Sequence, residues 1–340
     1  MSSLYLLSEI NNSISSPKLV GIARLAAMGE SIEDGRDVEY FTLPIKSVLN
    51  KCSAPRMPFA WTINPYRGCE FACKYCYARY THEFMEMRDG IDFERKIYVK
   101  QQSAWLLRRD LKKVKPGQSI ALGTATDPYQ PAERRYGMTR AIMEELALHQ
   151  GLDIGVVTKS QLILRDMEIL RKISAHNTLN INLTVTTMNV DLARKLEPRA
   201  PRPDLRMEAV RKLNEGGVNA GIICAPVLPG ITDGAADLEI LISAAAEANA
   251  KYVYPNPLFL KSCAWKMFMP FVEKEFPHLT SSYRERYKNN AYVDASYRKR
   301  IVALFDKLCR KHGLPDRNQR YASKQPTESP SRAGEQLRLF

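Results

Sequence analysis

Three of the seven cysteines of this chain lie within eight residues of one another. They are Cys69, Cys73 and Cys76, in the stretch YRGCEFACKYCYAR, and their spacing is CxxxCxxC. Three thiolates this close along a chain can converge on one metal centre. A structural zinc site, by contrast, takes four ligands and usually draws them from two separated cysteine pairs. No second pair follows in the sequence, so the spacing predicts a metal centre that lacks one protein ligand.

The missing ligand has several explanations. His82, six residues downstream, could complete a Cys₃His zinc site with unusual spacing, and an iron–sulfur cluster could serve plain electron transfer. A cubane cluster normally takes four cysteines, so one held by three keeps an open position on one iron. Open positions are typical of catalytic metal sites and are lacking in closed structural ones. The incomplete motif therefore favours a catalytic centre.

From Trp61 onward, apolar β-rich runs alternate with amphipathic helical patterns, which predicts βα units with parallel strands. Such a series can close partly into a barrel or open into a doubly wound sheet, and periodicity does not decide between them. In both folds the reactive groups follow the carboxyl ends of the strands. Strands are expected at 61–64, 119–125, 153–158, 180–187, 219–228 and 251–254, with helices near 101–114, 138–150, 161–174, 191–196, 204–216 and 234–248.

The remaining sequence suggests three further segments around a βα series at 56–258. Residues 1–55 show no periodic core and are interpreted as a lead-in segment with a short helix near 18–28. Residues 259–321 carry helical patterns and form a helical basic C-terminal region. Residues 322–340 are rich in Pro, Ser, Lys, Gln and Glu, a composition typical of a disordered tail.

The chain is basic, with 50 Lys and Arg against 37 Asp and Glu. The resulting charge of +13 favours polyanions such as nucleic acid, although a basic surface kept for solubility explains it equally. No apolar run reaches the roughly 18 residues of a membrane span, and the N-terminus lacks the pattern of a secretory signal. We therefore expect a cytoplasmic protein. In the C-terminal region four tyrosines are interleaved with basic residues: Tyr283, Tyr287, Tyr292 and Tyr297. This pattern is typical of a surface that binds nucleic-acid bases, and a solvated pair of amphipathic helices has the same pattern.

Several segments, in order and spacing, resemble one enzyme family. They are NPYRGC and CKYCYAR around the cysteines, GTATDPYQP (123–131), VVTKS (156–160), LEPR (196–199) and APVLPG (225–230). Together they are similar to the radical S-adenosylmethionine (SAM) superfamily, in particular its spore-photoproduct-lyase-like branch. The resemblance implies an α/β fold, a partial (β/α)₆ barrel. It also implies a [4Fe–4S] cluster on the three cysteines, with SAM chelating the fourth iron.

The resemblance further implies a reaction and an electron source. Reduction of the cluster would cleave SAM and release a 5′-deoxyadenosyl radical. Because the step needs a low-potential electron, flavodoxin or ferredoxin is the expected reductant. The cofactor-binding side chains would then lie at the strand ends: Tyr77 beside the adenine, Thr126 and Asp127 at the ribose or ammonium group, Lys159 at the carboxylate and Thr186 at the ribose.

One position departs from the family pattern. In spore photoproduct lyase a cysteine at the end of the second strand returns a hydrogen atom to the product radical, and Thr124 occupies that place here. A hydroxyl O–H bond is much stronger than an S–H bond, so Thr124 is a poor hydrogen-atom donor. Tyr129, on the same loop, is a weak candidate for this catalytic role, and Cys224 and Cys263 are other candidates that fit a structural role better.

The last five residues differ from the polar tail that precedes them. Gln336, Leu337, Leu339 and Phe340 form a QLRLF motif, which resembles the short peptide that docks bacterial repair proteins on the DNA sliding clamp. A flexible linker ahead of such a motif keeps a tethered catalytic domain near its site of action. An apolar tail that folds back on the body is the alternative.

These features favour a radical SAM enzyme that acts on nucleic acid, in DNA lesion repair or modification with lyase-like chemistry. Two alternatives remain. The same chemistry could act on RNA, a peptide or a small molecule, or the protein could be a non-catalytic, metal-stabilised nucleic-acid-binding protein.

Overall fold

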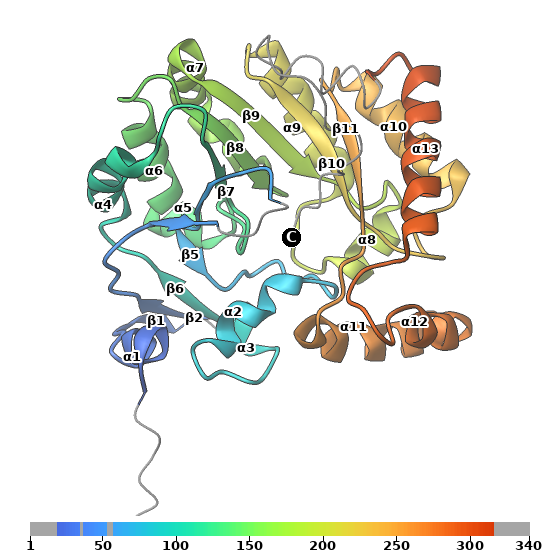
Figure 1. Ribbon diagram of the computed structural model, residues 1–340, viewed down its shortest axis with the longest axis horizontal. Coiled ribbons are helices and arrows are strands. Elements are labelled where there is room, and N and C mark those ends of the chain that lie inside the picture. The colour runs from blue at the N-terminus through green and yellow to red at the C-terminus, as the bar shows by residue number, and fades with distance from the viewer. Residues whose placement is uncertain (1–18, 35–36, 53–56, 316–340) are drawn as a thin grey trace, which may run out of the picture.

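The computed structural model describes residues 19–34, 37–52 and 57–315. A seven-stranded sheet lies at its centre (Figure 1). Six of its strands run parallel, and the seventh, β3, pairs antiparallel with β4 at one edge. In order across the sheet the strands are β3 (Leu49–Lys51), β4 (Trp61–Ile63), β7 (Ser119–Leu122), β8 (Asp153–Thr158), β9 (Thr178–Thr184), β10 (Ala220–Val227) and β11 (Val253–Pro257).

The strand order decides between the two βα folds that the periodicity left open. The six parallel strands follow one another in chain order, whereas a doubly wound sheet reverses its direction partway across. The two edge strands, β3 and β11, are not paired with each other, so the sheet is an open, partial barrel. The predicted partial (β/α)₆ barrel is confirmed, and each of the six expected strands coincides with an observed one to within a few residues.

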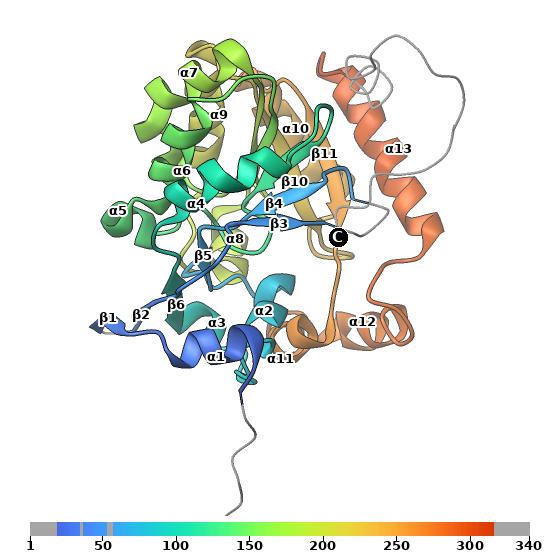
Figure 2. The ribbon, with the colours of Figure 1, turned by 60° about the vertical axis from the view of Figure 1, so that its left-hand side comes forward.

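Helices connect successive parallel strands and cover the outside of the sheet (Figures 1 and 2). The strands bury apolar side chains such as Ile154, Val156 and Leu183, each 0% exposed, in one continuous core. The connecting helices are α4 (Ser103–Asp110) with η2 (Leu111–Lys113), α5 (Ala132–Tyr136), α6 (Met138–Leu146), η3 (Gln161–Asp166) with α7 (Met167–His176), α8 (Val190–Leu196), α9 (Pro203–Glu215) and α10 (Ala235–Glu247).

A second, four-stranded sheet was not predicted from the sequence. Its order is β1 (Ser31–Asp34), β2 (Glu39–Thr42), β6 (Lys96–Val99) and β5 (Tyr66–Arg67), and it is flanked by α1 (Gly21–Ala27), α2 (Tyr80–Glu83) and α3 (Asp92–Arg95). Only the helix α1 was expected among residues 1–55, so that interpretation missed β1, β2 and β3. The strands are too short to show a period, and β2 pairs with β6, which lies more than fifty residues further along the chain.

The small sheet leads directly into the cysteine segment. Strand β5 ends at Arg67, and Gly68 follows with a φ of +84°. A Cβ atom on Gly68 would lie 2.7 Å from the carbonyl oxygen of Lys96, so only glycine lets the chain cross β6 this closely. The four-stranded sheet therefore sets the point from which the cysteine loop begins.

The C-terminal region is helical, as expected. It comprises α11 (Ser262–Glu275), η4 (Pro277–Leu279), α12 (Thr280–Arg286) and α13 (Ala295–Lys311). No helix among the described residues is long and apolar enough to cross a membrane. Of the four tyrosines interleaved in the C-terminal region, only Tyr292 is half-buried. The other three are core residues whose hydroxyls donate to acceptors within the protein: Tyr283 to Pro229, Tyr287 to Leu258 and Tyr297 to Asp233.

Candidate active site

The cysteine loop lies at the carboxyl edge of the parallel sheet, between β5 and the short helix η1 (Tyr77–Arg79). Cys69 and Cys73 are buried and Cys76 is half-buried. Burial raises the pKa of the Cys69 thiol, and Asp127, Cys73 and Cys76 raise it further. Because the three thiols act on one another electrostatically, they lie near one another on this loop. The part of the chain that the structure describes holds no group of three Cys, His, Asp or Glu side chains close enough to bind a single metal ion, whereas an iron–sulfur cubane takes each thiolate on a different iron.

Two cations face this loop. Burial raises the pKa of Cys73 to about 12, and Lys159 opposes that rise. Burial likewise raises the pKa of Cys76, and the guanidinium of Arg79 opposes it. Arg79 is itself buried; it donates to the Cys73 carbonyl at 3.1 Å and lies 3.5 Å from a carboxylate oxygen of Glu94. Cationic partners favour thiolates, the form in which cysteines bind metals.

His82 packs against the four-stranded sheet and not beside the three cysteines with which a Cys₃His zinc site would need it. Its ring is 1% exposed, packs edge-on against Phe93 and Tyr98, and has Nε2 3.0 Å from the carbonyl oxygen of Lys96 in the small sheet. Burial lowers its pKa to about 4, so the imidazole is neutral. His82 and the loop cysteines do not form a metal-holding group in the described ranges. The zinc arrangement considered from the sequence is therefore not observed there.

The loop after β7 holds the cysteine loop in place. The Thr126 hydroxyl donates to the Gly68 carbonyl at 2.6 Å. Gln130, fully buried, donates to the same carbonyl at 3.1 Å and accepts from the Glu70 backbone N–H at 2.9 Å. The predicted cofactor contact of Thr126 remains a prediction; in the structure its hydroxyl positions the loop.

Asp127 joins the ends of two neighbouring strands. Its carboxylate accepts from the Thr158 hydroxyl at 2.6 Å, from the Lys159 backbone N–H at 2.7 Å and from the Tyr129 backbone N–H at 2.9 Å. Burial raises the pKa of Asp127, and the bonds from Thr158 and Lys159 lower it. The three donors occupy the carboxylate, so Asp127 orients the strand ends that surround the cysteine loop.

Lys159 and Thr186 meet at Glu197, a residue for which the sequence analysis proposed no role. The Thr186 hydroxyl donates to Glu197 Oε1 at 2.9 Å, and Lys159 Nζ lies 4.0 Å from the same oxygen. Arg206 donates to Glu197 Oε2 at 2.5 Å, and the Tyr75 hydroxyl also donates to this carboxylate. Burial opposes ionisation of Glu197, but Arg206 and Lys159 outweigh it and lower its pKa. An anionic residue thus holds the end of Lys159 beside Cys73.

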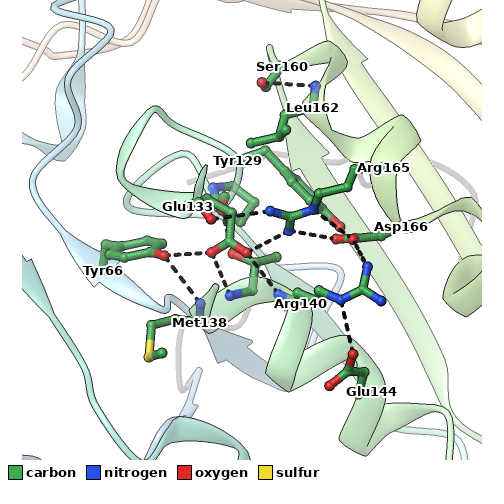
Figure 3. Close-up of polar contacts among 12 residues, drawn as sticks. Tyr66, Tyr129, Glu133, Met138, Arg140, Glu144, Ser160, Leu162, Arg165 and Asp166 are labelled. Atoms are coloured by element: carbon green, nitrogen blue, oxygen red, sulfur yellow. Dashed lines mark hydrogen bonds and ion pairs between the residues drawn. The ribbon is translucent and has the colours of Figure 1, made fainter. Parts of the chain in front are cut away.

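A buried polar network supports the loop after β7 from behind (Figure 3). Glu133 accepts from the Tyr66 hydroxyl at 2.5 Å and from Arg165 at 2.9 Å, and Asp166 accepts from Arg140 at 2.7 Å. Tyr129 points into this network and is 1% exposed. Burial, together with Asp166 and Glu133, raises its pKa well above the ordinary value. The structure therefore places the Tyr129 phenol among these carboxylates, apart from the residues that surround the thiols.

Tyr77 and Thr124 lie together at the mouth of the site. The Tyr77 hydroxyl donates to the Thr124 carbonyl, and the Thr124 hydroxyl accepts from the Asn64 amide at 3.3 Å. Cys263 of α11 has its sulfur 3.5 Å from the Tyr77 carbonyl oxygen. Of the predicted site residues, the structure brings Asp127, Lys159 and Thr186 around the cysteine loop. Thr126 bonds the start of the loop at Gly68, and Tyr77, at the end of the loop, bonds Thr124.

Comparison with known proteins agrees with this geometry. An uncharacterized protein of Mycobacterium tuberculosis is 34% identical over 79% of this chain and 79% of its own length. An uncharacterized protein of Methanocaldococcus jannaschii is 25% identical over 76% of this chain and 91% of its own.

Solved structures of spore photoproduct lyase have a similar fold. One, complexed with dinucleoside spore photoproduct, superposes with a TM-score of 0.60 at 13% identity and covers 80% of this chain and 79% of its own. A variant with bound AdoMet (SAM) and the same photoproduct has a TM-score of 0.59 over the same shares, also at 13% identity. The family model described as the radical SAM superfamily matches residues 63–240, which is more than half of the chain. The matched range includes every site residue named above except Cys263. The chain belongs to the radical SAM superfamily, and its cofactors are those of the family, a [4Fe–4S] cluster and SAM.

Proposed function

We propose that this radical SAM enzyme acts on nucleic acid, in the repair or modification of DNA. The observation that carries the proposal is the cysteine loop, whose three thiols lie at the carboxyl edge of a partial barrel between the cations Lys159 and Arg79. The similar fold of spore photoproduct lyase, solved with a dinucleoside photoproduct, and the charge of +13 support a nucleic-acid substrate.

Cys69, Cys73 and Cys76 would hold the cluster, and Lys159 would receive the carboxylate of SAM. When bound, these cofactors would supply the chemistry of hydrogen-atom abstraction, through a 5′-deoxyadenosyl radical. The chain's own residues prepare the site for this. Gln130 fixes the start of the cysteine loop, Glu197 holds Lys159 in place, and burial shields the Cys69 and Cys73 thiols from water.

The proposal includes two partners. Flavodoxin or ferredoxin would deliver the electron, and a bacterial sliding clamp would bind Gln336, Leu337, Leu339 and Phe340. These four residues lie outside the described part of the chain, so the clamp motif remains a prediction from the sequence. A DNA-directed, clamp-associated enzyme of this kind would work in the cytoplasm.

The test is anaerobic reconstitution with iron and sulfide, followed by SAM and dithionite. We expect absorbance near 400 nm from iron–sulfur charge transfer and formation of 5′-deoxyadenosine. Cys73→Ala should lose both, whereas Cys309→Ala, a matched change of a buried cysteine in α13, should keep both. Zinc in place of iron, or equal 5′-deoxyadenosine from Cys73→Ala and wild type, would refute the enzymatic assignment. Deuterated oligonucleotides then identify the substrate, because label transferred to 5′-deoxyadenosine marks the abstraction site.

A further inference from the structure

A row of aromatic side chains extends from the cysteine loop to the connection between α12 and α13. Tyr77 directly follows the third cysteine, and its ring stacks on Tyr80 with centroids 6.5 Å apart. On one side the Tyr80 ring meets Phe84 edge-on at 5.6 Å. On the other, Tyr77 meets Phe259 at 6.1 Å, and Phe259 meets Tyr292 at 4.5 Å. We call Tyr77, Tyr80, Phe84, Phe259 and Tyr292 the aromatic row.

The row is open to solvent to a degree that core aromatics are not. Phe84 is 61% exposed, and the other four members are half-buried. By contrast, Tyr283, which comes from the same C-terminal region as Tyr292, is 1% exposed and bonds within the protein. One exposed ring that continues into four half-buried rings forms an apolar patch, and exposed apolar patches mark binding sites.

The backbone holds the far end of the row in place. Phe259 and Tyr292 form an antiparallel β-bridge, and the Leu260 N–H donates to the Ala291 carbonyl at 2.8 Å. The segment after β11 and the α12–α13 connection are thereby tied together, with their two rings in contact. Rings fixed before binding lose little conformational freedom when a flat ligand stacks on them.

Cations accompany the aromatic rings. Lys261 has its Nζ 4.2 Å from the centroid of the Tyr80 ring. The guanidinium of Arg67 donates to the carbonyl of Thr81, the residue after Tyr80, at 3.0 Å. Alternating aromatic faces and cations match the alternating bases and phosphates of a nucleic-acid strand, and every base offers a flat π-face.

We propose that the aromatic row is a stacking surface for unpaired bases of a DNA strand, with Lys261 facing the strand's phosphates. The inference rests on the proposed function, because it specifies how that substrate reaches the site. An enzyme that reacts with a base must first take it out of the helical stack. Tyr77, the middle member of the row, directly follows the third cysteine, so a base displaced from the stack would be supported up to the reacting centre.

The test measures binding and chemistry on the same reconstituted holoenzyme. Fluorescence anisotropy gives the affinity for a labelled oligothymidylate, for an abasic strand of equal length and for an oligouridylate. Phe84→Ala and the double variant Phe84→Ala/Tyr292→Ala should weaken thymidylate binding, by about tenfold for the double variant. Neither should change binding of the abasic strand, which has phosphates and no bases. Lys261→Ala should weaken binding of both strands, and Trp105→Ala, 63% exposed on α4, should weaken neither.

Three results would overturn the stacking surface: wild-type thymidylate affinity in the double variant, an equal loss on thymidylate and abasic strands, or no oligonucleotide binding by wild type. Tighter binding of oligouridylate than of oligothymidylate would overturn its assignment to DNA. Formation of 5′-deoxyadenosine without oligonucleotide is measured in parallel and should be unchanged in Phe84→Ala. Its absence from wild type would count against the proposed radical chemistry, not against the row, so the two failures are distinguishable.

Discussion

Removing the charge of Glu197 should destabilise the fold far more than removing the charge of a similar surface glutamate. In Glu197→Gln, Thr186 and Tyr75 can still donate to the amide oxygen, but the buried cations Arg206 and Lys159 lose their counter-charge. Arg206 and Glu197 are each 1% exposed, so solvent cannot replace the lost partner.

The loss in free energy of unfolding is set by the burial of the ion pair rather than by the distance between its atoms. Breaking a buried ion pair by removing one partner costs about 3–5 kcal/mol. Unfolding entropy of about 2.1 cal/mol/K per residue gives roughly 0.7 kcal/mol/K for 340 residues, so the midpoint of thermal unfolding should fall by about 4–7 °C. Because ion pairing lowers the folded pKa of Glu197, its stabilisation is present above the ordinary carboxylate pKa. It is lost as pH falls through the folded value.

Glu208→Gln is the matched control. Glu208 pairs with Arg211 at 2.5 Å, the same distance as in the Glu197–Arg206 pair, but the two side chains are 37% and 39% exposed. Exposed pairs contribute little, so this variant should unfold close to wild type. Differential scanning calorimetry of both apo variants at pH 7 measures the comparison. Equal midpoints of thermal unfolding for Glu197→Gln and Glu208→Gln would refute the reasoning that burial makes the Glu197 ion pair more stabilising than an exposed one.

Three further changes have defined outcomes. Gln130→Ala leaves the Glu70 N–H without its buried acceptor, at about 1–3 kcal/mol, and leaves the Gly68 carbonyl with Thr126 as its side-chain donor. Iron bound per chain after reconstitution should therefore fall, whereas the variant Gln101→Ala, at an exposed position, should bind iron normally. Burial lowers the pKa of Lys100 from 10.5 to about 7, so between these pH values the unfolded chain binds more protons and the free energy of unfolding rises with pH. Lys100→Met should remove that rise when the free energy of unfolding is measured in urea as a function of pH. An unchanged pH dependence would contradict this reasoning. Deleting residues 336–340 should abolish capture by purified sliding clamp while leaving 5′-deoxyadenosine formation intact; unchanged capture would remove the clamp prediction.

The fold was predictable where one period governs a whole element. Parallel strands such as β10 are buried along nearly their full length, so their sequence is a continuous apolar run. The four-stranded sheet lacked such a signal, because β5 has two residues and β2 reaches its partner β6 only through the folded chain. The choice between barrel and open sheet depended on strand order, a long-range property that periodicity does not contain.

The residues of the candidate site were likewise predictable from the sequence only in part. The cysteine motif was visible because its chemistry depends on local spacing. Glu197 lies in the LEPR segment that the resemblance marked, but its partners come from other strands and helices, so its role was not visible. Arg206 was missed because an arginine on an amphipathic helix has the sequence pattern of a surface residue, although this one is 1% exposed. The interleaved tyrosines show the opposite problem, because Tyr283 and Tyr287 suggested base stacking but are core residues. The aromatic row instead joins residues 77–84 to Phe259 and Tyr292, which are far away in sequence.

Thr124, at the end of β7, would limit what a substrate radical can do after it forms. Thr124 presents a hydroxyl where the resemblance places a hydrogen-donating cysteine, and its carbonyl is bonded by Tyr77. The other thiols near the site are poorly placed to replace it. Cys224 is fully buried in β10, and the buried Cys263 has its sulfur against the Tyr77 carbonyl. Within the described ranges no such thiol stands at the end of β7, so a reaction that begins as in that lyase must end by a different hydrogen transfer, or with none.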